Sequence, residues 1–125
     1  MAITVLIVDD SAIMLNLIKQ ALSPDGYSLV LARNGEEGIA AFKEHEIDIV
    51  ITDINMPVMD GIVLISELRK IDSNVPIFAL TSEADEHVRE RGRQAGANGW
   101  MVKPFQPAQF RDIIKQVVKR FGLLL

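Results

Sequence analysis

Residues 47–61 read IDIVITDINMPVMDG, and this stretch indicates the fold of the chain. Its first part, 47–51, is almost continuously apolar and β-branched, which is typical of a strand buried on both faces of a sheet. The strand ends at Asp53, because Asn55 and Pro57 cannot continue it. Ligands of open α/β sheets bind at the carboxyl ends of the strands. Asp53 is therefore either a functional acid or an ordinary turn former, as Asp often is.

The composition is that of one acidic domain. The chain has 125 residues, and a hydrophobic fraction of 49% is enough for one core. The net charge of −4, without a run of Lys or Arg, argues against direct binding of nucleic acid. The absence of cysteine excludes a disulfide framework, a thiol nucleophile and a thiolate metal site. No apolar run approaches the roughly 20 residues that span a bilayer, and the N-terminus has no secretory pattern, so we expect a cytoplasmic protein without membrane association.

Apolar runs with turn signals between them predict four further strands. They cover residues 4–8, 29–32, 75–80 and 99–102. Helical patterns alternate with the strands. Ser11 is suited to cap the first helix, and Asn34, with Glu37 three residues on, the second. The apolar stripe expected for the first helix consists of Ile13, Met14, Leu17, Ile18, Ala21 and Leu22.

Three more helices complete the pattern. One follows Asp60 and Gly61, and a second, charged and weakly periodic, is expected over residues 83–94. The last has Pro107 in its first turn and the clearest amphipathic stripe of the chain, which we expect to be core. Alternating strands and helices predict an α/β fold, in which a doubly wound, five-stranded parallel sheet carries five helices. The flavodoxin-like strand order 2-1-3-4-5 suits five strands, and it places strands 1 and 3 side by side.

Polar side chains follow four of the five strands. They are Asp9 and Asp10, Asp53, Thr81, and Lys103. Two unit charges ~4 Å apart interact by about 4 kcal/mol at an effective dielectric constant of 20, so three carboxylates in one cleft need a cation. Oxygen ligands without His or Cys favour a hard cation, Mg²⁺ before Ca²⁺ or Mn²⁺.

A carboxylate beside a metal ion, an ammonium group and a hydroxyl group has what phosphoryl transfer to that carboxylate requires. The transition state spreads charge over the equatorial oxygens, so positioning and electrostatics supply most of the catalysis. With a reference pKa of about 3.9, Asp53 is ionised at neutral pH and needs no general base. Aspartyl phosphate is a known product of such nucleophiles. Each residue also has a structural alternative, since Asp9 or Asp10 can cap a helix and Thr81 can simply end a strand.

Four motifs follow one another along the whole chain: Asp9-Asp10, Asp53 within DINMPVMDG, Thr81-Ser82 and Lys103-Pro104. In this order and spacing they resemble the receiver domain of two-component response regulators. The resemblance implies a single receiver domain over residues 1–125, in which Asp53 accepts a phosphoryl group from a sensor histidine kinase or a phosphotransfer protein. It implies that Asp9, Asp10, Asp53 and the backbone carbonyl of Asn55 hold Mg²⁺. It also implies that Lys103 pairs with the phosphoryl group.

The same resemblance implies a conformational switch. Thr81 would move to donate a hydrogen bond to a phosphoryl oxygen and so bias a two-state equilibrium. The family's switch aromatic, commonly Tyr or Phe, lies three residues before the lysine and is Trp100 here. Trp100 could instead only cover the sheet edge. Glu83 and Asn55 lie where the family tunes loss of the phosphoryl group, and the face of helix 4, strand 5 and helix 5 would meet a downstream protein.

Two other functions use a related site. A phosphatase with an aspartate nucleophile would share Mg²⁺ and Asp53, but such enzymes usually carry an acid two residues on, where this chain has Asn55. A flavin-binding module of the same fold would need a first loop that accepts phosphate, whereas Asp9 and Asp10 repel it. We therefore expect no turnover enzyme, but a phosphoacceptor that assists its own phosphorylation and dephosphorylation.

Overall fold

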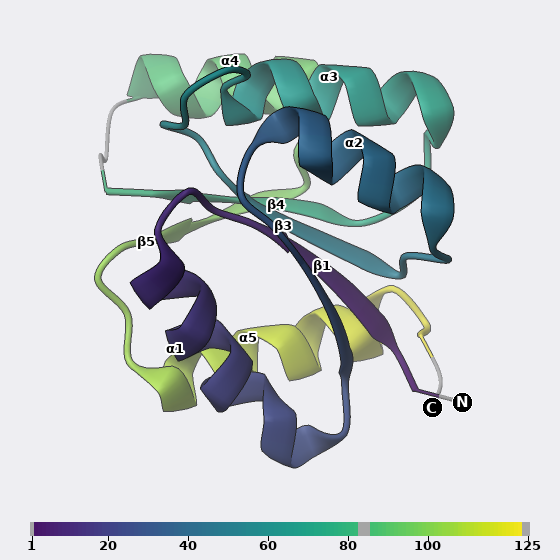
Figure 1. Ribbon diagram of the computed structural model, residues 1–125, viewed down its shortest axis with the longest axis vertical. Coiled ribbons are helices and arrows are strands. Elements are labelled where there is room, and N and C mark those ends of the chain that lie inside the picture. The colour runs from purple at the N-terminus through teal and green to yellow at the C-terminus, as the bar shows by residue number, and fades with distance from the viewer. Residues whose placement is uncertain (1, 83–85, 124–125) are drawn as a thin grey trace.

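The computed structural model describes residues 2–82 and 86–123. Its strands form one parallel sheet in the order β2-β1-β3-β4-β5, which confirms the predicted topology (Figure 1). The strands are β1 (Thr4–Val8), β2 (Ser28–Ala32), β3 (Ile49–Asp53), β4 (Ile77–Thr81) and β5 (Gly99–Val102). The helices are α1 (Ala12–Leu22), α2 (Gly35–Glu44), α3 (Gly61–Ile71), α4 (Glu86–Ala95) and α5 (Pro107–Arg120), and a short 3₁₀ turn, η1 (Ser23–Asp25), follows α1.

Two strands begin later than the sequence pattern suggests. β3 begins at Ile49 rather than at residue 47, and just before it the Asp48 side chain accepts a hydrogen bond from the Thr4 amide at 2.8 Å. β4 begins at Ile77 rather than at residue 75, because Pro76 has no N–H group for the ladder. β4 in turn extends to Thr81, so this residue is the last of its strand.

Side chains predicted as caps do start the helices. The Ser11 hydroxyl accepts a hydrogen bond from the Met14 amide at 3.2 Å, and the Asn34 side chain accepts one from the Glu37 amide at 2.9 Å. α5 begins at Pro107, whose missing N–H group costs nothing in a first turn. α4 is present, but the residues at its predicted start, 83–85, lie outside the described residues.

The sheet separates two apolar cores. α1 and α5 cover one face, and α2, α3 and α4 cover the other (Figure 1). Alternate residues of β1 serve the two sides: Val5 and Ile7 contact the core under α1 and α5, while Leu6 contacts the core under α2 to α4. Because both faces are covered, β3 is buried along its whole length, as its β-branched sequence predicts.

The core prediction for α1 was wrong at one residue. Ile13 was expected on the buried stripe of α1 but is 84% exposed, and Leu15 is buried in its place. At 100° per residue, Ile13 lies on the side of the helix opposite Ile18, which is fully buried against the sheet. The apolar residues of α1 therefore form a wider band than the sheet can cover.

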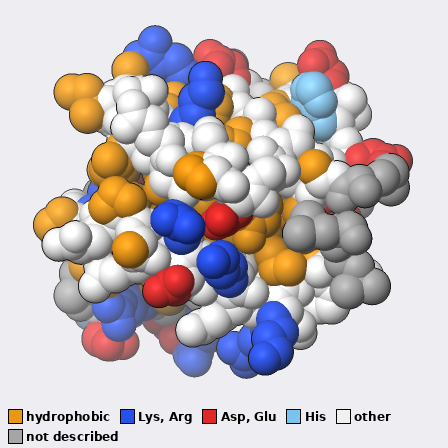
Figure 2. Space-filling model, turned by 90° about the horizontal axis from the view of Figure 1, so that it is seen from below, with side chains coloured by type: hydrophobic (Ala, Val, Ile, Leu, Met, Phe, Trp, Pro, Cys, Tyr) orange, Lys and Arg blue, Asp and Glu red, His pale blue; other side chains and the backbone are white. Residues whose placement is uncertain are grey.

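The outer surface of the α1 and α5 layer is mixed in character. Basic side chains stand among acidic and hydrophobic ones on this face (Figure 2). One basic residue, Arg111 of α5, pairs with Asp25 of η1 at 3.4 Å and so links α5 to the turn that follows α1. Within the described residues, no helix has both the length and the apolar character needed to cross a bilayer.

Candidate functional site

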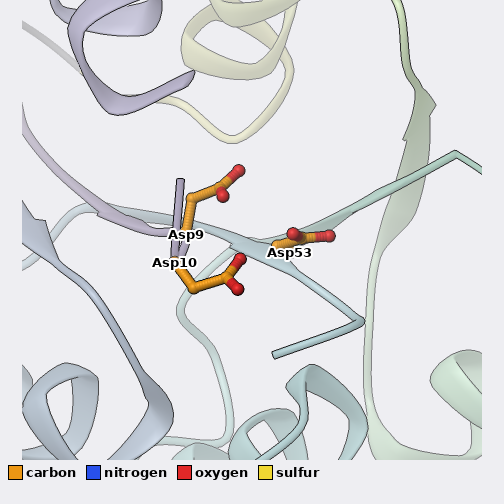
Figure 3. Close-up of side chains that lie close together, drawn as sticks. All are labelled: Asp9, Asp10 and Asp53. Carbon is orange, nitrogen blue, oxygen red and sulfur yellow. The ribbon is translucent and has the colours of Figure 1, made fainter. Parts of the chain in front are cut away.

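Three carboxylates meet at the carboxyl ends of β1 and β3. Asp9 and Asp10 follow β1, and Asp53 is the last residue of β3, which pairs with β1 in the sheet (Figure 3). One oxygen from each of the three carboxylates lies within 4.8 Å of the others. Asp9 is completely buried and Asp53 is 7% exposed, whereas Asp10 is on the surface. The strand order thus brings Asp53 together with residues that are 43 and 44 positions away in the sequence.

Lys103 bridges two of these carboxylates. Its Nζ lies 3.1 Å from an oxygen of Asp9 and 3.1 Å from an oxygen of Asp53. Burial by itself would lower the pKa of Lys103, but the hydrogen bonds and charges of the two carboxylates outweigh burial and raise the pKa above its ordinary value. The ammonium group is therefore charged at neutral pH and is shared between two acids.

The environment of Asp53 raises the pKa of its carboxyl group. Burial is the largest cause, the nearby charge of Asp9 is the second, and Lys103 together with the Ile54 amide opposes both. The Ile54 N–H donates to the second carboxylate oxygen of Asp53 at 2.8 Å. One oxygen of Asp53 is thus bound by a backbone donor and the other by an ammonium group, which fixes the orientation of the carboxylate.

Two neighbours of Asp53 were missed in the sequence, where they look like ordinary strand and turn residues. The buried Thr52 hydroxyl donates to the backbone carbonyl of Asp53 at 2.9 Å. A methyl group on Gly61 would overlap that same carbonyl oxygen, so only glycine allows α3 to begin so close to the end of β3. The position of a glycine at the first residue of a helix, directly after its Asp60 cap, is the signal that could have found it.

The cluster can hold a metal ion. Its three carboxylates carry three negative charges against the one positive charge of Lys103, so two negative charges are left for a divalent cation. All the side-chain donors are oxygens, which suits a hard cation. Asp10, the exposed member, keeps the group open to solvent.

The structure also places the other predicted site residues. Thr81 is buried at the end of β4, next to β3, and its carbonyl accepts a hydrogen bond from the Lys103 amide at 2.8 Å. Asn55 is exposed in the loop that follows β3. Trp100 is half-buried on β5, with its ring against α4, while Glu83 lies outside the described residues.

Curated relatives match nearly the whole chain. The sequence is 38% identical to the chemotaxis protein CheY of Halobacterium salinarum, with 94% of this chain and 98% of that protein covered. It is 42% identical to a probable transcriptional regulator, ycf27, of Guillardia theta, with 93% of this chain but only 45% of that protein covered. The chain thus spans about half the length of the ycf27 relatives that it matches.

Solved structures and a family model agree with this similarity. The chemotaxis protein CheY4 of Vibrio cholerae superposes with a TM-score of 0.90 at 33% identity, covering 94% of this chain and 99% of that one. A CheY-like receiver domain protein of Methanospirillum hungatei superposes with a TM-score of 0.93 at 26% identity, covering 98% of each chain. The family model of the response regulator receiver domain matches residues 5–115. The chain therefore belongs to the response regulator receiver domains of two-component signal transduction, which act as signalling switches.

Proposed function

We propose that Asp53 is the phosphoacceptor of this receiver domain and that its donor is a phosphorylated histidine of a sensor kinase or phosphotransfer protein. A carboxylate oxygen of Asp53 attacks phosphorus, the phosphorus–nitrogen bond of the donor breaks, and the histidine leaves. The observation that carries this proposal is the position of the Lys103 Nζ, 3.1 Å from both Asp9 and Asp53 beside a third carboxylate. Charge that develops on the transferred group is stabilised by such pre-positioned groups.

The donor set of the cluster fits Mg²⁺. Asp9, Asp10 and Asp53, with the backbone carbonyl of Asn55, would hold the ion. Bound there, it would neutralise charge on the oxygens of the incoming phosphoryl group. Asp53 itself needs no proton acceptor, because the ionised form is the nucleophile, and the Ile54 amide keeps one of its oxygens fixed at 2.8 Å.

After transfer, Lys103 and Thr81 would bind the new group. The Lys103 ammonium group lies at hydrogen-bonding distance from an Asp53 oxygen, and it would keep its ion pair with Asp9. Thr81 ends the neighbouring strand, so a movement at the end of β4 would bring its hydroxyl to a phosphoryl oxygen. We assign Thr81 and Trp100 as the residues through which phosphorylation changes the face of α4, β5 and α5.

That face offers an apolar hollow for a protein partner. The hollow has a volume of about 460 Å³ between β5 and α5, and its apolar lining includes Val102, Pro104, Phe105 and Ile113. The negative net charge and the mixed surface of the α1 and α5 layer favour a protein as the direct partner, rather than nucleic acid or a membrane (Figure 2). We place this interaction in the cytoplasm. Relatives are named both as a chemotaxis protein and as transcriptional regulators.

The test is the intact mass of the protein after incubation with acetyl phosphate, with and without Mg²⁺. We expect one Mg²⁺-dependent phosphoryl adduct on the native chain and none on Asp53→Asn. Asp10→Ala should weaken Mg²⁺ binding, measured by titration calorimetry, because it removes one of three carboxylates. A correctly folded protein without an adduct would contradict the proposal, as would Asp53→Asn that is still modified. Continuous hydrolysis of the donor at many turnovers per minute would instead favour the phosphatase alternative. A bound yellow flavin would favour the flavin-binding module.

A further inference from the structure

α4 contains a glycine in its interior. Gly92 is buried in the seventh position of this ten-residue helix. Glycine destabilises a helix interior relative to alanine, because it has more backbone freedom to lose and no side chain to pack. A buried glycine at such a position therefore indicates that a neighbouring group needs the space of a side chain.

That neighbour is Trp100. A Cβ atom placed on Gly92 would lie 2.5 Å from Cη2 and 2.5 Å from Cζ2 of the indole, well inside the 3.5–4.0 Å or so at which carbon atoms pack. The edge of the ring thus occupies the volume that any other residue would fill. Val88 and Ala95 of α4 pack against the same apolar cluster as Trp100, and Glu86, Arg89 and Arg93 line a surface pocket together with Trp100.

The contact joins the two elements that flank the candidate switch. α4 follows β4 and its terminal Thr81, whereas Trp100 lies on β5, three residues before Lys103. β4 and β5 pair directly, with Ala79 opposite Trp100 and Thr81 opposite Val102. A movement of α4 relative to β5 must therefore change the space available to the indole, and a movement of the indole must change the position of α4.

We propose that Gly92 determines the position of Trp100. The space beside Gly92 lets the indole lie inward against α4, and we call this position of the ring the seat. The seat stabilises one of the two arrangements of the α4 and β5 face. Its loss would release the ring to solvent and favour the other arrangement. The seat itself follows from the contact, while its link to phosphorylation rests on the function proposed above.

The first experiment measures the seat in unphosphorylated protein. Trp100 is the only tryptophan, so its emission maximum and its quenching by acrylamide report directly on the ring. We expect Gly92→Ala to shift the emission to longer wavelength and to raise the quenching constant about twofold or more, as burial of the ring is lost. Arg91→Ala, a change at the adjacent exposed residue, is the control and should leave both values unchanged. Equal values for Gly92→Ala and the native chain would overturn the proposal.

The second experiment asks whether the indole is the obstacle. In the native background, we expect Gly92→Ala to lower the midpoint of thermal unfolding despite the better helix propensity of alanine. In a Trp100→Phe background, whose ring is shorter, the same change should raise the midpoint. If Gly92→Ala does not fold in the native background, it should still fold with Trp100→Phe. The same sign of effect in both backgrounds, or failure to fold in both, would overturn the proposal.

The third experiment measures the link to the site. Beryllofluoride is an unreactive analogue of a phosphoryl group, and its apparent dissociation constant in the presence of Mg²⁺ follows from the rise in unfolding midpoint with concentration. Coupling is reciprocal, so a variant that shifts the face must shift this constant; we expect a change of roughly fivefold for Gly92→Ala and none for Arg91→Ala. An unchanged constant in a variant with a displaced indole would overturn the link. A native chain that neither binds beryllofluoride nor forms the aspartyl adduct would overturn both the link and the proposed function, whereas the first two experiments would still decide the seat.

Discussion

The edge of the sheet at which the strands begin and the edge at which they end use charged side chains in opposite ways. At the edge where the strands begin, Arg69 donates to the carbonyls of Gly96 and Asp72 at 2.9 and 3.2 Å and to the Asn98 side chain at 2.8 Å. Asn98 in turn accepts the Ile77 amide at 2.8 Å. The acceptors are uncharged carbonyl oxygens, and these hydrogen bonds hold the ends of α3 and α4 together.

At the edge where the strands end, like charges face one another. Asp9 and Asp53 share a single ammonium group, with the third carboxylate, Asp10, beside them, and burial and the charge of Asp9 raise the pKa of Asp53. One edge is arranged for stability, and the other keeps an unbalanced charge that a cation and a phosphoryl group would complete. The comparison predicts that variants at the two edges differ in magnitude, in pH dependence and in their response to Mg²⁺.

The largest effect is expected at Lys103. Lys103→Met leaves the completely buried Asp9 and its neighbour Asp53 without a counter-charge, and we expect the free energy of unfolding in EDTA to fall by about 3 kcal/mol. Denaturant unfolding measures it, with Lys115→Met on the exposed side of α5 as the control. Mg²⁺ should restore part of the loss, because it supplies the missing positive charge. A loss no greater than that of the control would show that Lys103 does not balance the cluster.

A smaller effect is expected at the opposite edge. Arg69→Met removes three hydrogen bonds of a charged group, and we expect a loss of about 2 kcal/mol. In this case Mg²⁺ should restore nothing, since the hydrogen bonds of the guanidinium group go to carbonyl oxygens at the other ends of the strands and not to the carboxylate cluster. Denaturant unfolding with and without Mg²⁺ compares the two variants. An equal Mg²⁺ response would remove the distinction between the two edges.

The pH dependence of stability should distinguish the edges further. Because the pKa of Asp53 is raised above 3.8 in the folded state, the native protein binds this proton more tightly than the unfolded chain does. The contribution of Asp53 to stability therefore falls as the pH rises from 3.8 through the higher folded pKa. Asp53→Asn should reduce the slope of the free energy of unfolding against pH in that window, measured in EDTA. Arg69→Met should leave this slope unchanged. A slope that Asp53→Asn does not alter would contradict the assigned direction.

The smallest effect concerns strained backbone beside the site. Val58 has a φ of 70°, in the left-handed region that β-branched residues avoid, and the Met59 amide donates to the Pro57 carbonyl across it at 2.8 Å. Val58 is 73% exposed, so its replacement removes little packing. We expect Val58→Gly to raise the free energy of unfolding by about 1 kcal/mol in denaturant unfolding, because glycine has no Cβ atom to strain a turn with positive φ. Val63→Gly, at an exposed helical position, is the control and should not stabilise the protein.

The sequence was sufficient where local pattern and chain order agree. The β-branched run before Asp53, four further apolar runs and five helical segments predicted the sheet and its strand order, and the order alone predicted that Asp9, Asp10 and Asp53 meet. Caps such as Ser11 and Asn34 were also readable, because a cap acts on amides only three residues away. In each case the interaction is either local or a direct consequence of topology.

Other features depend on which surfaces come into contact, and residue types do not encode that. Ile13 is apolar, as core residues are, but it is exposed because the sheet covers only part of the apolar band of α1. Lys103 was recognisable as a site residue. That its ammonium group pairs with both Asp9 and Asp53 depends on the positions of three strand ends, which the sequence does not give.

The role of Gly92 shows the same limit most clearly. In the sequence it is a helix interior residue with poor propensity, and its meaning appears only where the ring of Trp100 fills the space above it. The sequence by itself determined the alternation of elements, the family and the residues able to carry charge at the site. Tertiary structure alone decided which of those charges are paired and which small residues make room for large ones, because close contacts form between side chains that are distant in the chain.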